Sequence, residues 1–322
     1  MKILVTGSTG LVGSEAVKYF TEKGWEVIGI DNNGRSHFFG TPTKTPSTLA
    51  DIRDYDGLVT GFMQYGPFDA VIHAAAQPSH DYSKENVFED FEINARGTLN
   101  LLEAARRHSP NAVFVHCSTD KIYGDGMTRK LTDNTTRLHN ASPFSEKTQI
   151  VPPLSPFGVS KLAADFYVQE YAAQGWLTTG VFRMGCITGK AHEGAEQHGF
   201  LAYLAKCIKE GITYKIYGFH GKQVRDQIHA RDLISAFEHF IAAPTSGAVY
   251  NMGGGEERSV SVFEAAELIE NKTGKKFVYE YVEEPRFGDR PWDIHDVSKF
   301  KTDYPDWEYE YSLDSIINDL CA

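Results

Sequence analysis

The chain begins MKILVTGSTGLVGS, an apolar run followed by Gly7, Gly10 and Gly13 within nine residues. The run Ile3–Val5 predicts a strand, and Leu11–Glu22 has the apolar spacing of a helix. Glycines at such a junction let the backbone turn tightly and approach a pyrophosphate at the helix N-terminus. A strand, a glycine turn and a helix in this order favour a parallel α/β sheet, although a tight turn without a ligand also explains the glycines.

The end of the next strand supplies a second feature of a dinucleotide site. The strand Glu26–Ile30 runs into Asp31, which follows Gly13 by 18 residues. A carboxylate there can accept hydrogen bonds from the two ribose hydroxyls of NAD. Asp31 would repel the 2′-phosphate of NADP, although Arg35 nearby means that NADP is not excluded as the cofactor. Asp51 and Ile52 are placed to border the adenine, but a solvated loop aspartate accounts for Asp51 equally well.

Strand and helix patterns alternate through the first half of the chain. Short apolar strands separated by helices predict a Rossmann-like, doubly wound parallel sheet with a smaller C-terminal α/β lobe for the substrate. We expect residues 1–182, with parts of 222–251, to bind the dinucleotide, and residues 183–221 and 252–322 to form the lobe. Residues 125–156 lack apolar periodicity and are interpreted as a long loop. Further expected strands are Ala70–His73, Ala112–His116, one from Val181, Tyr214–Tyr217, Val224–His229 and Ala248–Asn251; further helices are Val87–Arg107, Leu162–Ala173, Gly199–Glu210 and those starting at Arg231 and Val262.

Composition narrows the class of protein. The 322 residues are 41% hydrophobic with a net charge of −11 and no basic stripe, so nucleic acid is not an expected partner. A local basic pocket for a small phosphate ligand stays open. No stretch approaches ~20 apolar residues, and no secretory leader precedes the first strand, so we expect a cytoplasmic protein that does not span a membrane. The four cysteines have no paired spacing, which is typical of reduced thiols, and no metal site is expected.

Several ordered motifs resemble those of the extended short-chain dehydrogenase/reductase family. Within it the chain is most similar to the CDP-tyvelose (CDP-paratose) 2-epimerases, over essentially all 322 residues. The motifs are TGSTGLVG, Asp31, 73-HAAAQ-77, 93-INARGTLNLLEA-104, 118-STDKIYG-124, 157-FGVSK-161, 223-QVRDQIH-229 and 250-YNMGGG-255. The resemblance implies NAD as cofactor, bound by Gly7, Thr9, Gly10, Leu11, Val12, Asp31, Asn32, Asp51, Ile52, Ala74, Ala75, Ala76 and Lys161.

The same resemblance implies a catalytic set of Thr119, Lys161 and the ring at position 157. In the family a tyrosinate takes the proton of a sugar hydroxyl, and a lysine lowers the pKa of that phenol. This chain has Phe157, which keeps the ring and lacks the hydroxyl. Three explanations stay open: an introduced change that traps substrate, a natural subgroup that uses another base, or a protein that binds a nucleotide sugar without turnover.

Other titratable residues could replace the missing phenol. Cys186 follows a strand end, and a thiol near Lys161 could titrate close to neutral pH, although a buried cysteine is often only a small apolar group. Asp120 and Lys121 follow Thr119 directly, and His80 lies in the loop after 73-HAAAQ-77, where a solvated histidine is equally plausible.

The motifs support two reactions. The overall pattern indicates epimerisation of a nucleotide-activated hexose, a CDP-sugar by resemblance, at C2. Against this, Thr119-Asp120-Lys121 resembles the acid/base pair of the family's 4,6-dehydratases, whereas the 2-epimerases tend to carry Asn at position 120.

Substrate contacts and assembly complete the expectations. Arginine suits a diphosphate, and the family motifs point to Arg225, Arg286 and Arg290. An ion pair of Arg225 with Asp226 or Asp232 is the alternative. Gln77, His80, Thr119, His198 and Phe200 would line the sugar and the base, with Phe200 as a core aromatic in the other interpretation. Asn94 is expected to hold its helix to the sheet. The family pairs two helices, here 87–107 and 156–173, into a four-helix bundle, so we expect a homodimer in which small residues permit close approach, namely Ala104, Ala105, Ala163 and Ala164.

Overall fold

A computed structural model describes residues 1–34, 48–124, 131–140, 142–189 and 199–322. These residues pack as two compact units. Unit 1 comprises Met1–Ile122, Ser155–Arg183 and Leu233–Tyr250, and unit 2 comprises Tyr123–Leu154, Met184–Asp232 and Asn251–Ala322. The described residues of the segment 123–154, which the sequence placed with the dinucleotide-binding part, belong to unit 2.

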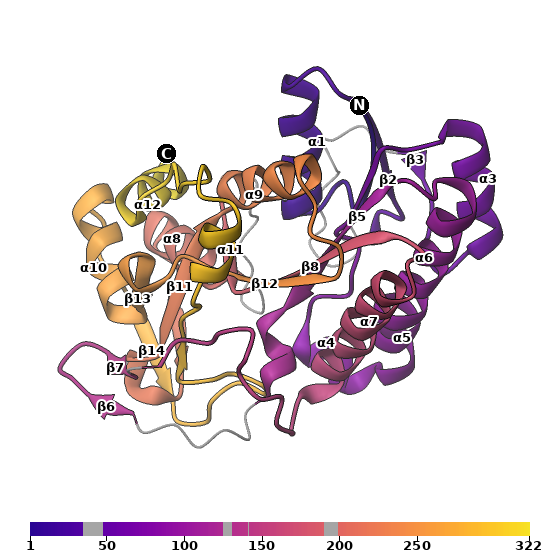
Figure 1. The fold of residues 1–322 in the computed structure, drawn as a ribbon. Coiled ribbons are helices and arrows are strands. Elements are labelled where there is room, and N and C mark those ends of the chain that lie inside the picture. The colour runs from indigo at the N-terminus through magenta and orange to yellow at the C-terminus, as the bar shows by residue number, and fades with distance from the viewer. Residues whose placement is uncertain (35–47, 125–130, 141, 190–198) are drawn as a thin grey trace. The chain divides into compact units, whose positions relative to one another are not determined.

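Unit 1 is built on a seven-stranded sheet. The pairs β1–β2, β1–β4, β4–β5 and β2–β3 are parallel, and the register places Thr6 beside Ile30 and His73, and His73 beside His116. This confirms the Rossmann-like α/β fold (Figure 1). In spatial order the strands are β12 (Ala248–Met252), β8 (Thr178–Met184), β5 (Val113–Thr119), β4 (Ala70–His73), β1 (Lys2–Thr6), β2 (Glu26–Asp31) and β3 (Thr48–Leu49).

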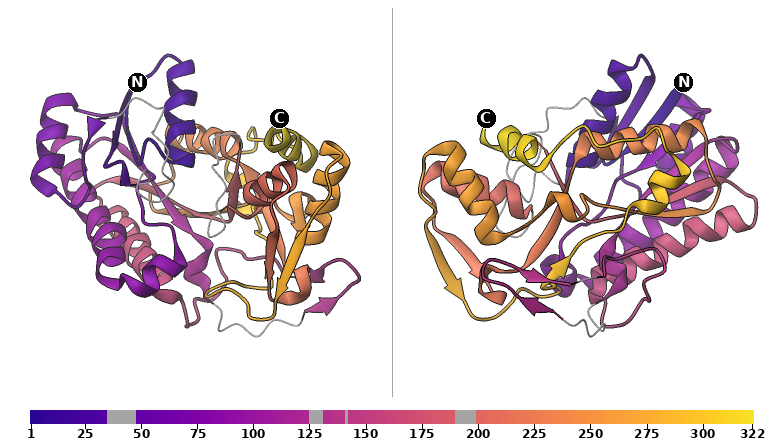
Figure 2. Two further views of the ribbon diagram at one scale, coloured as in Figure 1. Left: turned by 180° about the vertical axis from the view of Figure 1, so that it is seen from behind. Right: turned by 60° about the vertical axis from the view of Figure 1, so that its left-hand side comes forward.

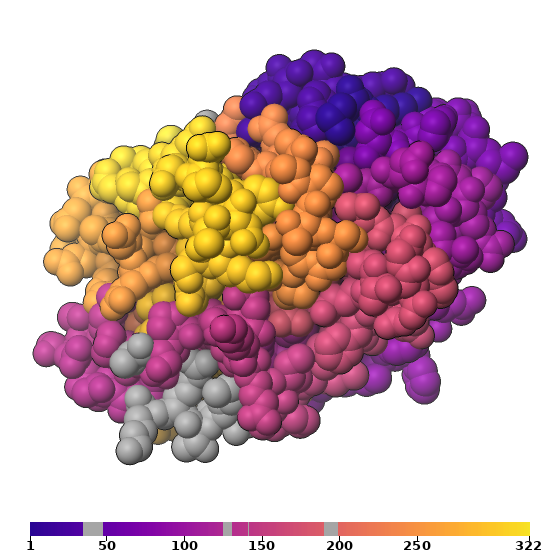
Figure 3. Space-filling view, viewed as in Figure 1, coloured from indigo at the N-terminus to yellow at the C-terminus, as the bar shows by residue number. Residues whose placement is uncertain are grey.

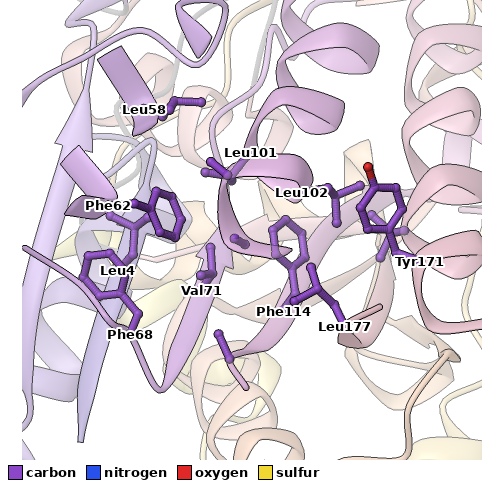
Figure 4. Close-up of a cluster of buried hydrophobic side chains, with 14 of the residues drawn as sticks. Leu4, Leu58, Phe62, Phe68, Val71, Leu101, Leu102, Phe114, Tyr171 and Leu177 are labelled. Atoms are coloured by element: carbon purple, nitrogen blue, oxygen red, sulfur yellow. The ribbon is translucent and has the colours of Figure 1, made fainter. Parts of the chain in front are cut away.

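Helices cover both faces of this sheet (Figures 1 and 2). On one face lie α3 (Tyr55–Tyr65), α6 (Gly97–His108) and α7 (Ser155–Ala173), and on the other lie α1 (Leu11–Glu22) and α9 (Ala230–Ala242). Phe114 packs in the cluster under α3, α6 and α7 shown in Figure 4. Successive strand residues point to opposite faces, so Val181 of β8 packs in the same cluster and Phe182 packs against Phe237 of α9. The near-continuous apolar strands follow from this double burial.

One predicted helix differs from the structure. The pattern over Val87–Arg107 predicted a single helix, but the chain forms α5 (Val87–Phe91), one π-helical turn η1 (Glu92–Arg96) and then α6. Buried Asn94 bonds outward to the loop after β4, and a π-helical turn is a known adjustment of a helix at a functional site. The short helix α4 (His80–Glu85) precedes α5, and the short 3-10 turn η2 (Asp120–Tyr123) follows β5.

Unit 2 has its own small sheets and core. Strand β11 (Val224–His229) pairs with β13 (Ser259–Ser261), β15 (Trp292–Asp293) and β9 (Cys186–Thr188), and β10 (Tyr214–Tyr217) pairs with β14 (Tyr279–Val282). The hairpin β6 (Thr132–Asp133) and β7 (Leu138–His139) lies within the stretch interpreted as loop. The helices are α8 (Phe200–Glu210), α10 (Val262–Thr273), α11 (Ser298–Asp303) and α12 (Leu313–Cys321), with 3-10 turns at Phe219–Gly221 and Glu256–Arg258. Across the described ranges, no helix combines the length and the apolarity that a membrane crossing needs.

Candidate functional site

The glycine turn after β1 is shaped by contacts within unit 1. Gly7 has φ +66°, and a Cβ on it would lie 2.6 Å from the backbone nitrogen of Ala75. A Cβ on Gly13 would lie 2.0 Å from the carbonyl oxygen of Gly7. Among the described residues, a Cβ on Gly10 would meet only that oxygen, at 3.3 Å. Packing therefore requires glycine at positions 7 and 13, while position 10 needs it chiefly where a ligand would approach the backbone.

The N-terminus of α1 is suited to an anion. Its N-cap is Gly10, which offers no side-chain cap, and the first turn carries no acidic residue. The N–H groups of a first turn need acceptors, and the helix dipole favours negative charge there. A pyrophosphate supplies such acceptors, so the turn and the first residues of α1, Leu11 and Val12, fit the diphosphate of a dinucleotide.

Asp31 at the end of β2 faces the glycine turn. Its Oδ2 accepts hydrogen bonds from the backbone N–H of Thr9 at 3.0 Å and from Thr9 Oγ1 at 2.7 Å, and its Oδ1 accepts from the N–H of Asn33 at 2.7 Å. These bonds hold the carboxylate beside the turn, where ribose hydroxyls of a dinucleotide would donate to it. Arg35, the residue that left NADP possible as the cofactor, lies outside the described residues.

Asp51 and Ile52 also belong to this edge of the sheet. Asp51 Oδ2 accepts from Arg53 Nη2 at 2.7 Å and from Asn32 Nδ2 at 3.0 Å. The hydrogen bond from Arg53 is the largest effect, and it lowers the pKa of Asp51 to about 2. Ile52 is buried and would contact any side chain placed at Gly97. Asp51 is thus a charged group tied to the Asn32 segment rather than a freely solvated loop residue.

Residues 73–76 continue from β4 toward the glycine turn. His73 is buried, with Nδ1 2.8 Å from Thr6 Oγ1 and Nε2 2.8 Å from Thr98 Oγ1. Burial lowers the pKa of His73 to about 3, so the ring is neutral and serves as a structural link between β1 and α6. The N–H of Ala74 donates to the carbonyl oxygen of Thr6, and the N–H of Ala75 donates to Thr6 Oγ1. Ala76 is exposed beyond them.

Lys161 lies inside α7 and reaches the end of β5. Its side chain is buried, and Nζ donates to the carbonyl oxygen of Cys117 at 2.6 Å. Burial lowers the pKa of Lys161 to about 8, against the opposing effects of Cys117, Asp165 and Asp90. Burial also raises the pKa of Cys117 to about 12, so that thiol is neutral. The Lys161 ammonium therefore lies at the carbonyl group of Cys117, two residues before Thr119 at the carboxyl end of β5.

Thr119 opens a short chain of polar contacts. Its Oγ1 donates to Asp120 Oδ1 at 3.2 Å and accepts from the N–H of Lys121 at 3.3 Å. Asp120 is buried and pairs with Lys121 Nζ at 3.3 Å. The consecutive residues Thr119, Asp120 and Lys121 thus bring a hydroxyl, a carboxylate and an ammonium group into contact in that order.

Phe157 occupies the place of the expected tyrosine and is packed by α4. Its ring centroid lies 4.9 Å from that of His80, at an interplanar angle of 67°. His80 Nδ1 lies 3.0 Å from Ser155 Oγ, and the N–H of Phe157 donates to Ser83 Oγ at 3.2 Å. The structure thus brings His80 and position 157 together, although the sequence separates them by 77 residues.

Gln77 has a different environment from the one predicted. Its side chain donates to Asp90 Oδ1 at 2.7 Å and to the carbonyl oxygen of Ser79, and it accepts from the N–H of Ser79. Asn94 pairs with the backbone N–H and C=O of Gln77, as expected for a residue that holds helix to sheet. Both amides are buried and used internally, so we place Gln77 in this network instead of among substrate ligands.

Two buried carboxylates beside Lys161 escaped the sequence analysis. Asp90 accepts from Ser160 Oγ, and burial raises its pKa. Asp165 accepts from both Nε and Nη2 of Arg183 at 3.0 Å and from Ser118 Oγ at 2.8 Å. Their spacing was an available signal, because Asp165 follows Lys161 by one helical turn and Asp90 precedes Asn94 by one.

In unit 2 the predicted arginines are engaged with neighbouring groups. Arg225 is buried and pairs with Asp289 and Asp293, and it donates to the carbonyl oxygens of Val224 and Arg290. Burial opposes its charge, but the two carboxylates raise the pKa of Arg225 overall. The ion pair foreseen with Asp226 or Asp232 is wrong. Asp226 accepts from His295, and Asp232 accepts from the N–H groups of Glu310 and Tyr311.

Four further predicted residues belong to unit 2. Arg290 Nε lies 2.7 Å from Asp293, with its guanidinium over the ring of Phe144, and the guanidinium of Arg286 lies 4.5 Å from the ring centroid of Tyr217. Cys186 opens β9 and is half-buried. Phe200 packs against the core cluster under α8, as the alternative interpretation held. His198 lies outside the described residues.

Comparison with known proteins agrees with this geometry. A model of the NAD dependent epimerase/dehydratase family matches residues 3–253. The chain is 34% identical to the CDP-paratose 2-epimerase of Salmonella typhi over 84% of each chain, and 29% identical to the dTDP-glucose 4,6-dehydratase of Salmonella typhimurium over 87% of this chain and 80% of that one. The UDP-glucose 4-epimerase of Thermus thermophilus, solved with NAD, superposes with a TM-score of 0.83 over 99% of both chains at 26% identity.

Proposed function

Because the chain belongs to the NAD-dependent epimerase/dehydratase family and uses NAD as its cofactor, we propose that it is an epimerase of a CDP-hexose that acts at C2. The observation that carries the proposal lies in unit 1. The glycine turn, Asp31, Thr119 and Lys161 all stand at the carboxyl ends of β1, β2 and β5 or beside them, the edge where parallel sheets bind ligands. The CDP-hexose and the C2 position rest on similarity to the Salmonella typhi enzyme.

The residues of the chain have separate tasks in this proposal. Bound NAD supplies an acceptor that takes a hydride from the sugar carbon and gives it back. Gly10 and the first turn of α1 hold the diphosphate, and Asp31 holds the ribose. Thr119 turns its hydroxyl hydrogen from Asp120 to the reacting sugar oxygen, and Lys161 favours negative charge there because it is a buried cation.

A panel of nucleotide-activated hexoses tests the proposal. We expect the purified chain to contain NAD and to convert one CDP-hexose to its C2 epimer. Deuterium placed at C2 of that substrate should remain in the product, because the hydride returns within the site. Epimerisation with loss of deuterium to water, or turnover of UDP-hexoses alone, would contradict the proposed reaction or the proposed nucleotide.

A specific observation supports a second candidate, a 4,6-dehydratase. Asp120 and Lys121 form an acid and a base directly after Thr119, at 3.3 Å from each other, and the Salmonella typhimurium relative is a dTDP-glucose 4,6-dehydratase. This reaction would expel the C6 hydroxyl and give a 4-keto-6-deoxy sugar, which absorbs ultraviolet light in alkali. The same panel separates the two reactions, and tight binding without product would identify a binding protein.

We also propose a homodimer through the two helical segments predicted for it, but through other side chains than the predicted alanines. Ala104, Ala105 and Ala164 are fully buried in the unit 1 core, so they cannot form a contact surface. Exposed apolar side chains lie instead on α5 and α7, and α7 reaches the surface shown in Figure 3. They are Phe88 (89% exposed), Phe91, Val159, Phe166 and Tyr167.

Substituting Phe88→Asp tests this surface. We expect the dimer to dissociate about 100-fold more readily, because the interface would bury a carboxylate in place of an aromatic anchor. Sedimentation velocity over a dilution series measures the change. Ile212→Asp, at an exposed apolar residue of unit 2, is the matched control and should leave sedimentation unchanged. An unsubstituted chain that sediments as a monomer at high concentration would refute the dimer.

A further inference from the structure

We infer that His80 is the proton acceptor that replaces the missing phenol of residue 157, an inference that rests on the proposed function. The imidazole packs against the Phe157 ring, with the two centroids 4.9 Å apart. A titratable ring thus packs against the ring that stands where the family has its tyrosine. Imidazole is the side chain best suited to take and return a proton near neutral pH.

The segment around Phe157 holds His80 through both its side chain and its backbone. Ser155 Oγ lies 3.0 Å from His80 Nδ1 and also accepts from the N–H of Gly158 at 3.3 Å. Ser83 Oγ donates to the carbonyl oxygen of His80 at 2.7 Å and accepts from the N–H of Phe157 at 3.2 Å. α4 and α7 are therefore tied together at His80, and the bond between Nδ1 and Ser155 Oγ orients the imidazole.

Backbone strain at Ser155 supports a functional role for its side chain. Ser155 has φ +61°, a conformation that costs a non-glycine residue free energy. Such a residue persists when its side chain is needed in one place, and here the hydroxyl faces the His80 ring. With its proton on Nδ1, His80 donates to Ser155 Oγ and presents the Nε2 lone pair as the base.

The other candidate bases fit less well. Asp120 is already engaged, because it pairs with Lys121 and accepts from Thr119. Burial raises the pKa of Cys117 to about 12, so that thiol keeps its proton near neutral pH. Among these candidates His80 is the one whose ring packs against the ring at 157, in the part of the chain that the structure describes.

The step balances in atoms and electrons. The O–H bond of the sugar hydroxyl breaks, its proton goes to His80 Nε2, and its electron pair becomes the second bond of the ketone. The C–H pair of the same carbon leaves as hydride to the oxidised dinucleotide. On return of hydride to the other face, His80 gives the proton back to the oxygen, so neither an external acid nor an external oxidant is consumed.

His80→Asn is the first test, because asparagine keeps a donor for Ser155 but cannot take a proton. We expect kcat for the CDP-hexose to fall about 10²-fold with NAD content unchanged. His239→Asn is the matched control and should keep full activity. Within the described part of the chain, His239 hydrogen-bonds to the backbone of its own helix, at Ser235. Imidazole added to His80→Ala should restore part of the lost rate. An activity of His80→Asn within twofold of the unsubstituted chain overturns the inference.

Phe157→Tyr in the His80→Asn background is the decisive test. We expect it to restore activity at least 10-fold, because the phenol supplies the base that the first change removed; a merely structural role of His80 gives no such rescue. If the unsubstituted chain is inactive and Phe157→Tyr alone activates it, the inference fails and the proposed function stands. If both forms hold NAD and neither turns over any sugar, both fail.

Discussion

Replacing Gly13 with alanine is expected to abolish dinucleotide binding and to lower the free energy of unfolding by about 3 kcal/mol. The added Cβ would lie 2.0 Å from the carbonyl oxygen of Gly7 and 2.6 Å from its carbonyl carbon, and neither backbone atom can move without opening the turn. Urea denaturation measures the stability, and release of bound NAD after acid treatment measures the occupancy.

Substitutions at two other glycines separate the effect on NAD binding from the effect on stability. Gly10→Ala should fold with nearly normal stability and still lose most bound NAD, because its Cβ meets only one protein atom, at 3.3 Å, but points where the backbone would approach the diphosphate. Gly61→Ala in α3 is the control. Its Cβ meets nothing within 4 Å, so it should keep NAD and gain up to about 1 kcal/mol. Normal NAD content in Gly13→Ala would contradict the site.

Lys161→Met is expected to reduce kcat by about 10³-fold or more. The change removes the buried cation that favours negative charge on the sugar oxygen, and it keeps the length of the side chain. Steady-state kinetics with the CDP-hexose measures the loss. Lys18→Met, at an exposed residue of α1, is the control and should have no effect. A loss smaller than 10-fold would remove Lys161 from the reaction.

The same change should stabilise the fold near neutral pH. The pKa of Lys161 is lowered from 10.5 to about 8, so burial disfavours its charged form. Below pH 8 the lysine is protonated in both states and the folded state bears the full penalty. Between pH 8 and 10.5 the folded state loses the proton first, and the penalty disappears as pH rises. We expect Lys161→Met to raise the free energy of unfolding by about 2 kcal/mol at pH 7.

Urea denaturation at pH 7 and pH 10, with the dinucleotide removed from both proteins, measures this difference. The stability gain should shrink toward zero at pH 10, where the unsubstituted lysine is neutral in the folded state. Lys18→Met should show no gain at either pH, since surface substitutions typically change stability by less than about 0.5 kcal/mol. A gain that is equal at both pH values would mean that side-chain packing, and not charge, causes it.

Local sequence patterns predicted the α/β framework well. Strand-like patterns gave β4, β10 and β11 with their observed bounds, and β4 is mainly apolar because it is buried throughout in the central sheet. The helix Leu11–Glu22 also has its predicted bounds. The pattern failed at Glu92–Arg96, where the π-helical turn depends on hydrogen bonds between Asn94 and a loop 17 residues earlier. Apolar periodicity carries no information on such partners.

What the sequence by itself determined is the dinucleotide end of the protein. The glycine turn, Asp31 and the strand pattern are close along the chain, and their conformations follow from local sterics and helix-terminus electrostatics. Only the tertiary structure decided which side chains meet at position 157. His80 meets Ser155 and Phe157 because α4 packs on α7, and Asp90 lies near Lys161 because α5 packs on α7. Contacts between distant segments depend on how helices pack, and no local pattern encodes the distance between them.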